Sequence, residues 1–177
     1  MKYGIEFEYL IIDQSGAVRD FSNLPFAQIQ AMLADGPGRG DPELRTGDLG
    51  IKHGYWYLEG DERFDADGRF ATMAVKGVEI RTPPRESLDQ SLASLIEIER
   101  ELASRLGDHG LGLAIAGFNP QRSEYRLTPP LNAFERAQRG DNPSFEAPAV
   151  TTLSYGPDIN LSNPAWSAAQ TIAITRR

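Results

Sequence analysis

The stretch YGIEFEYLIID, residues 3–13, alternates between two kinds of side chain. Successive residues of a β-strand point to opposite faces of a sheet, and this alternation is typical of a strand with one buried face. One face of the predicted strand carries Tyr3, Ile5, Phe7, Tyr9 and Ile11, and the other carries Glu6, Glu8, Leu10 and Ile12. The first set predicts a core face, whereas the second predicts a face that displays two carboxylates.

The patterns that follow this strand predict an α+β fold. A short helix should follow Pro25, a hairpin should span residues 55–81 around a turn at 65–68, and a long helix should span 86–109 before Gly110. Further strands are predicted at 111–118 and 150–162, and a last helix after Asn163-Pro164. This order favours an antiparallel sheet with helices packed on one face, which leaves the other face free for a site.

Length and composition narrow the possible functions. The 177 residues suit a single domain, and the net charge of -7 argues against nucleic acid as a partner. The absence of cysteine excludes disulfides and thiolate ligands, and fits a reducing compartment. No apolar run approaches the roughly 18 residues that a membrane span requires. We therefore expect a cytoplasmic protein without a membrane partner.

The acidic face is the candidate metal site. Glu6 and Glu8 are two residues apart on one strand, so their Cα atoms lie roughly 6.6 to 6.8 Å apart. Glu79 belongs to a second strand, in which Val78 and Ile80 point the other way. Oxygen donors without His or Cys suit Mg²⁺ or Mn²⁺, and Mg²⁺ often bridges to substrate phosphates. The alternative is a solvated edge strand whose glutamates pair with lysine or arginine.

Four segments carry a family resemblance: GIEFEY at 4–9, GVEIRTPP at 77–84, GFNP at 117–120 and GPDINLS at 156–162. Their order resembles the glutamate–cysteine ligase family of carboxylate-amine ligases, which has a glutamine synthetase-like catalytic fold. The resemblance implies that Glu6, Glu8 and Glu79 bind the metal. It also implies ATP as cofactor: ATP phosphorylates a side-chain carboxylate, typically of glutamate, and an amine attacks the acyl phosphate.

The same resemblance suggests roles for residues around the metal. Arg81 is the candidate catalytic residue, a bidentate partner for a substrate carboxylate or phosphate, with a salt bridge across the sheet as the alternative. Candidate substrate or nucleotide ligands are Asn119, Asp158, Asn160 and Ser162, and also Arg126 for its charge, with a surface role as its alternative. Two positions depart from the family pattern, because Asn119 and Asp158 stand where histidine is usual.

The resemblance covers only the N-terminal part of the family's catalytic domain. Residues 1–177 would then form one incomplete domain, which implies either a homo-oligomer or a missing C-terminal half. Two other functions stay open. One is a catalytically silent binding or regulatory module, and the other is a structural fragment that assembles with a partner.

Several further segments are given structural interpretations. The glycine-rich residues 36–40 are interpreted as a connector, because they follow a helix and lack the ending of a phosphate loop. Residues 59–62, EGDE, are interpreted as a solvated turn, with a contribution to the metal site as the alternative. His53 and His109 are expected to be structural, and Arg122 to bind phosphate or lie at the surface.

Overall fold

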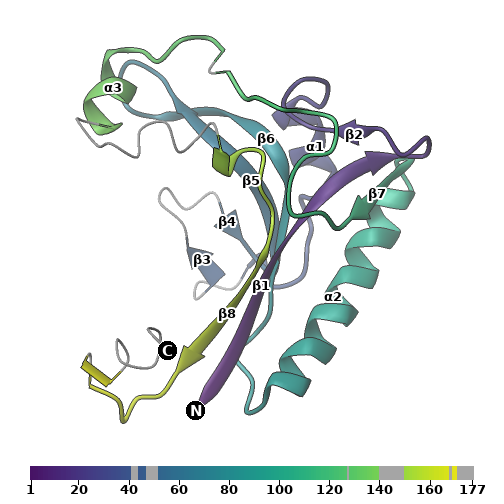
Figure 1. The fold of residues 1–177 in the computed structure, drawn as a ribbon, viewed down its shortest axis with the longest axis vertical. Helices are drawn as coiled ribbons and strands as arrows, with labels where there is room; N and C mark the ends of the chain where they lie inside the picture. The colour runs from purple at the N-terminus through teal and green to yellow at the C-terminus, as the bar shows by residue number, and fades with distance from the viewer. Residues whose placement is uncertain (41–43, 47–51, 127, 140–149, 168, 171–177) are drawn as a thin grey trace.

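The sheet is built around one long central strand. The computed structural model describes residues 1–40, 44–46, 52–126, 128–139, 150–167 and 169–170. Strand β1 (Lys2–Asp13) pairs antiparallel with β6 (Phe70–Arg81) on one side and with β8 (Pro157–Ser162) along residues 2–7 (Figure 1). Its C-terminal half pairs with β2 (Val18–Arg19) and β7 (Leu111–Ala114). Strand β5 (Trp56–Phe64) pairs with β6, and β3 (Arg45–Thr46) pairs with β4 (Lys52–His53).

The predicted alternation of β1 is confirmed. Ile5, Tyr9 and Ile11 belong to the main core, with Phe7 packed against it. Leu10 faces the opposite way and forms a second, smaller cluster with Val18 and Tyr155. One face of the sheet is therefore apolar along the strand, and the other is apolar only toward its C-terminal end.

The predicted hairpin is present, and a β-bulge interrupts it. The chain turns at Gly68, whose φ of 78° suits glycine. Glu59 pairs with Gly77 and Gly60 pairs with Val75, so Lys76 is an extra residue on β6. Because of this insertion, the buried apolar positions of β6 shift from Met73 and Val75 to Val78 and Ile80 and still face one core.

Two helices cover the apolar face. Helix α1 (Phe26–Met32) adds Ile29, and α2 (Leu88–Gly107) adds Leu95, Ile98, Leu102 and Leu106. The leucine spacing of the predicted helix puts Leu88 and Leu92 on one apolar stripe with Leu95, Leu102 and Leu106, but this is wrong at the N-terminal end, where Leu88 and Leu92 are exposed. Ser91 and Ser94 face the sheet there instead, because Ser91 donates to the Tyr3 carbonyl (2.9 Å) and Ser94 accepts from Arg85 (2.9 Å).

The third helix lies on the other face. In Figure 1, α3 (Ala133–Arg139) and the β3–β4 pair lie across the sheet from α2. Glu135 of α3 forms a buried ion pair with Arg63, near the tip of the hairpin. The expectation that all helices pack on one face is therefore correct for α1 and α2 and wrong for α3. None of the described helices is long and apolar enough to cross a bilayer.

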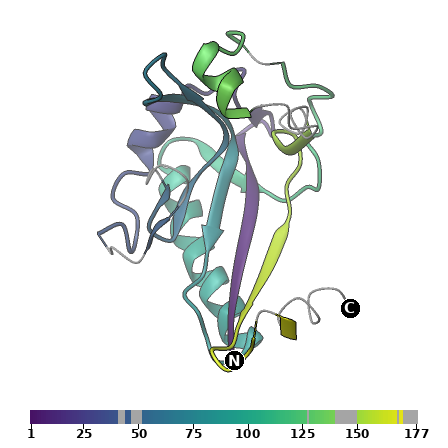
Figure 2. The ribbon, with the colours of Figure 1, turned by 90° about the vertical axis from the view of Figure 1, so that its left-hand side faces the viewer.

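The two predicted late strands are shorter than expected. Strand β7 ends at Ala114, and residue 118 makes only an isolated bridge to residue 154. Residues 150–153 form a turn closed by a hydrogen bond from the Leu153 amide to the Val150 carbonyl (3.0 Å), and β8 begins only at Pro157. Figure 2 shows β8 running beside β1. After Asn163 the chain forms a turn in place of the start of the predicted helix. Residues 171–177 lie outside the described part of the chain, as do residues 41–43 and 47–51, which follow the predicted connector.

Candidate active site

The sheet register brings glutamates from three strands together. Glu8 on β1 pairs directly with Glu79 on β6, and Glu79 pairs with Tyr57 on β5. Glu59 lies two residues beyond Tyr57 and therefore on the same face. One carboxylate oxygen from each of Glu8, Glu59 and Glu79 lies within 4.8 Å of the others, close enough for a single ion.

This cluster opens into a cavity of about 290 Å³. The cavity floor is the sheet, and its wall is the segment that leads into β8. Lining residues are Glu6, Glu8, Glu79, Ser154, Tyr155, Gly156, Pro157 and Asp158. Glu6 thus lies in the same cavity as the two other predicted metal ligands, although the tightest trio contains Glu59 in its place. The prediction placed three glutamates here, and the structure gathers four, with Asp158 beside them.

Glu79 is the most deeply buried of these carboxyl groups. It is 8% exposed and accepts a hydrogen bond from the Tyr57 hydroxyl (2.9 Å). Burial, followed by the neighbouring Glu59 carboxylate, raises the pKa of Glu79 to about 8. Burial and Glu79 in turn raise the pKa of the Tyr57 phenol. With a pKa near 8, Glu79 keeps its proton near neutral pH unless a cation favours the ionised form.

Two lysines partly neutralise the cluster. Lys76 donates to Glu8 (2.5 Å), and Lys52 forms an ion pair with Glu59. Burial lowers the pKa of Lys52, but the surrounding glutamates, Glu59 first, outweigh burial and raise it. Part of the alternative from the sequence therefore holds, since two of the four glutamates have a lysine partner. Glu6 and Glu79 instead accept hydrogen bonds from neutral groups, Asn160 (3.2 Å) and Tyr57.

Comparison with known families agrees with this geometry. The profile of glutamate-cysteine ligase family 2 matches residues 2–161, which include every strand and helix described above up to β8. The chain belongs to that family. A search among curated proteins found no match. The four segments that carry the sequence resemblance lie within the matched region except for Ser162, and the suspected family is confirmed.

Arg81 lies beside the acidic cavity. It pairs with Glu6 in the register and is 8% exposed. Its Nε donates to the Gly54 carbonyl (2.8 Å), and another nitrogen donates to the Leu44 carbonyl. Its guanidinium also lies 5.0 Å from the centre of the Tyr57 ring. Much of its hydrogen-bonding capacity thus holds neighbouring loops, so the predicted catalytic role of Arg81 stays a prediction.

Strand β8 carries three of the residues that are predicted to bind the substrate or the nucleotide. Asp158 pairs with Glu6 across the sheet and lines the acidic cavity. Asn160 and Ser162 line an adjoining cavity of about 250 Å³, which also contains Glu6 and Arg81. The three side chains are exposed and follow one another at every second position, so they share one face of the strand. The structure therefore brings these three residues to the edge of the glutamate cluster.

Two other predicted ligands lie elsewhere. Asn119 is 3% exposed and donates to the buried carboxylate of Asp20 (3.1 Å), so its amide is used in a structural network. Arg126 is a surface residue that pairs with Glu124 (3.0 Å). Neither lines the two cavities at the glutamate cluster. Arg122 also joins the Asp20 network, at 3.3 Å.

Sequence reasoning kept Glu59 only as the alternative to a solvated turn, and it missed both lysines. The interpretation of residues 59–62 as a solvated turn is wrong, because β5 continues through them to Phe64. The signal for Glu59 was present in the alternation of Tyr57, Glu59 and Asp61 opposite the core residues Trp56 and Leu58. The signal for Lys76 was the change of phase between Val75 and Val78, which indicates an inserted residue.

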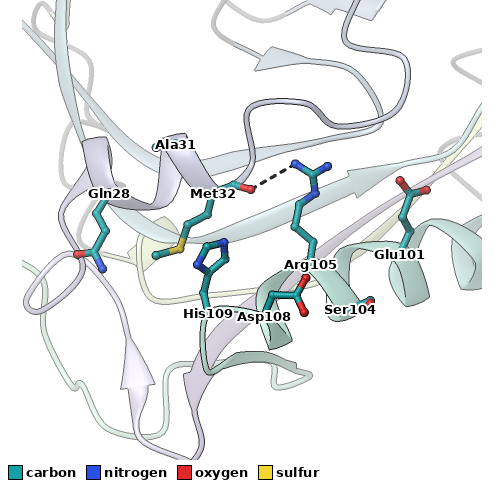
Figure 3. Close-up of a pocket in the computed structure, with 8 residues that line it drawn as sticks. All are labelled: Gln28, Ala31, Met32, Glu101, Ser104, Arg105, Asp108 and His109. Carbon is teal, nitrogen blue, oxygen red and sulfur yellow. Dashed lines mark hydrogen bonds between the residues drawn. The ribbon is translucent and has the colours of Figure 1, made fainter.

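A larger hollow of about 730 Å³ lies on the helix-covered side, between α1 and the end of α2. In Figure 3, Met32 of α1 lies near His109, which follows the end of α2, and Arg105 of α2 donates to the Met32 carbonyl (3.5 Å). Glu101 and Asp108 line the same hollow, so acidic and basic groups are mixed in it. This hollow has no concentration of one charge, and the structural role expected of His109 stays a prediction.

Proposed function

We propose that this protein is an ATP- and Mg²⁺-dependent carboxylate-amine ligase of the glutamate–cysteine ligase type. In this reaction the γ-phosphoryl group passes from ATP to a side-chain carboxylate of an amino acid, which gives an acyl phosphate and ADP. An amine then displaces phosphate and forms the amide. The observation that carries the proposal is the convergence of Glu8, Glu59 and Glu79 from three strands, in a chain of this ligase family.

The residues present fit a hard divalent cation. The donors are carboxylate oxygens, with Glu6 and Asp158 at the same cavity, and Mg²⁺ or Mn²⁺ prefers such ligands. Burial and nearby carboxylates disfavour the charge on Glu79, and a bound cation would reverse that preference. Glu8, Glu59 and Glu79 would hold the ion, with Glu6 beside them. A bound ion would supply positive charge that neutralises the charge developing in phosphoryl transfer.

The other residues orient and shield the reactants. Tyr57 holds the Glu79 carboxyl through its hydroxyl, and Lys52 and Lys76 fix Glu59 and Glu8. Arg81 and the β8 residues Asp158, Asn160 and Ser162 are proposed to bind the substrate or the nucleotide at the cavity rim. Positioning of this kind supplies most of the catalysis in phosphoryl transfer, since no protein nucleophile is needed.

Isothermal titration with Mg-ATP tests the proposal. The wild-type protein should bind, and both Glu6→Ala and Glu79→Ala should weaken binding by at least about tenfold. Glu97→Ala is the matched control, because Glu97 is an exposed residue of α2 on the far side of the sheet. Absence of binding by the wild type, or equal binding by all four proteins, would rule the site out.

A catalytically silent binding module is the second candidate. The lysine pairs favour it, because Glu8 and Glu59 already have cationic partners. Release of phosphate from Mg-ATP, measured with glutamate and a panel of amines, separates the two. A module would bind the nucleotide but release no phosphate above the rate of Glu79→Ala. Amine-dependent release by the wild type would support the ligase.

The proposal also has a structural setting. The sheet would be part of a glutamine synthetase-like catalytic domain in a cytoplasmic protein. A second copy or a C-terminal half would then supply the remaining phosphate-binding groups. Sedimentation of the protein with and without Mg-ATP distinguishes a monomer from a homo-oligomer.

A further inference from the structure

Lys76 reaches the acidic cavity because of the β-bulge. Val75 and Val78 both face the core, and two residues separate them. Regular alternation would allow only one residue between them on the opposite face, so the bulge places Lys76 and Gly77 together on the cavity side. Glycine is required at 77, since a Cβ there would lie 2.1 Å from the Tyr9 carbonyl oxygen. The local backbone is thus built to aim Lys76 across the sheet.

The ammonium of Lys76 uses all of its donors. It has three, and they reach the Glu8 carboxylate (2.5 Å), the Thr151 carbonyl (3.1 Å) and the Ser154 carbonyl (2.9 Å). The side chain is only 7% exposed, and its charge lies 5.4 Å from the centre of the Tyr155 ring. A buried lysine is costly unless every donor is paired, and here every donor is paired.

These contacts join a metal-ligand candidate to the cavity wall. The wall residues Ser154, Tyr155 and Gly156 come from a turn and a short irregular segment, which have no sheet ladder to hold them. Tyr155 donates to the Lys76 carbonyl (2.8 Å), so the attachment runs in both directions. Backbone hydrogen bonds to residues 117 and 119 and from the Glu8 amide also hold the segment, and Lys76 adds its attachment to β6.

The same contacts fix the Glu8 carboxylate. Lys76 binds its Oε1, and the Gly156 amide donates to its Oε2 (3.2 Å). A carboxylate offers about four lone-pair sites, so one on each oxygen stays available for an ion. Partners that orient a metal ligand in this way are worth roughly 10- to 100-fold in metal affinity.

We propose that Lys76 is a positioning residue of the acidic cavity, which orients Glu8 for a divalent cation and clamps residues 151–156 as the cavity wall. The inference rests on the proposed metal site. Lys52 offers a matched comparison, because it carries the same charge in the same cluster but pairs with Glu59 on β5. Removal of either lysine makes the cavity more negative. Only removal of Lys76 also frees Glu8 and the carbonyls of Thr151 and Ser154.

Two measurements on Lys76→Met, Lys76→Arg and Lys52→Met test the inference. Mn²⁺ affinity is followed by electron paramagnetic resonance, and amide exchange of residues 151–156 by mass spectrometry. Lys76→Met should lower Mn²⁺ affinity about tenfold or more and speed exchange of the segment. Lys76→Arg should restore a large part of both, whereas Lys52→Met, which frees Glu59 instead of Glu8, should leave the exchange of residues 151–156 as it is in the wild type.

The outcomes separate this inference from the function. Wild-type protein that binds no Mn²⁺ would defeat the proposed metal site. Wild-type protein that binds Mn²⁺, while Lys76→Met binds it equally or more tightly, would overturn the positioning role and leave the metal site standing. Equally fast exchange of residues 151–156 in Lys76→Met and Lys52→Met would also overturn it, because the attachment of this segment would then not be specific to Lys76.

Discussion

Glu8 on β1 and Glu79 on β6 are direct partners in the antiparallel register, so their carboxylates leave adjacent strands on the same face. Like charges opposite one another destabilise a sheet, and this pair is partly buried as well. Two features reduce the conflict. Lys76 neutralises Glu8, and a raised pKa keeps Glu79 protonated near neutral pH. A pair of carboxyl groups that needs such stabilisation is suited to bind a cation.

Metal binding should depend on Glu59, which the sequence indicated only as an alternative ligand. Glu59→Gln keeps the side-chain shape but removes one anionic donor from the trio, so Mn²⁺ affinity should fall at least about tenfold. A thermal shift measured with and without Mn²⁺ reports the same loss, because an ion that binds only the folded state raises its stability. Glu97→Gln should keep the full shift. An undiminished shift in Glu59→Gln would restrict the site to Glu6, Glu8 and Glu79.

The bulge should be intolerant of any side chain at Gly77. In Gly77→Ala the new Cβ would lie 2.1 Å from the Tyr9 carbonyl oxygen, so backbone must move. We expect a loss of at least about 2 kcal/mol in the free energy of unfolding, measured by urea denaturation. Gly107→Ala is the control, because nothing lies within 4 Å of the Cβ position there and alanine favours a helix. Similar stability of Gly77→Ala and wild type would show that the bulge is adaptable.

The sequence predicted the parts of the fold that rest on local periodicity. The strand at residues 3–13, the hairpin around Gly68 and the helix before Gly110 follow from alternation, turn glycine and apolar spacing. Short elements were less predictable. The composition of residues 150–153 favours a strand, but these residues form a turn. Long-range contacts matter here, since the carbonyls at 151 and 154 accept hydrogen bonds from Lys76, which is far away in the sequence.

The candidate site was predictable only in part for a related reason. Alternation places Glu6, Glu8 and Glu79 on open faces, but it does not say which strand lies beside which. The neighbour relation of β5 and β6 brought Glu59 to the cluster. Asn119 was assigned from a motif and Arg126 from its charge, but Asn119 lies in the Asp20 network and Arg126 at the surface. The pairing of distant strands therefore decides which residues meet at the site, and alternation along one strand does not specify that pairing.

Arg81 gives a test that separates a stabilising role from a ligand-binding one. In Arg81→Met the carbonyls of Gly54 and Leu44 lose a charged donor in a buried position, which should cost about 1.5–3 kcal/mol of unfolding free energy. Arg69→Met should change stability little, because that side chain is 75% exposed. Titration with Mg-ATP and with glutamate then shows whether Arg81→Met also loses ligand affinity. Unchanged stability with lost affinity would make Arg81 a ligand-binding residue only.

The ion pair between Arg63 and Glu135 should make stability depend on pH in the acid range. Glu135 is 2% exposed and accepts from Arg63 Nε (2.8 Å), from another Arg63 nitrogen (3.0 Å), and from the Phe64 and Asn132 amides. Arg63 contributes most to lowering the pKa of Glu135, from 4.5 to about 2. The folded state thus holds the ionised form more strongly than the unfolded state does.

The sign of the effect follows from that difference. Because the folded-state pKa is the lower one, the stabilisation is complete above pH 4.5 and is lost as pH falls toward 2. A shift of this size corresponds to about 3 kcal/mol of stability at neutral pH. Urea denaturation should therefore show a large gap between wild type and Glu135→Gln at pH 7, which narrows below pH 4. Glu97→Gln should differ little from wild type at either pH. A gap that stays constant from pH 7 to pH 2 would mean that the side-chain shape of Glu135, rather than its charge, stabilises the contact between α3 and the hairpin.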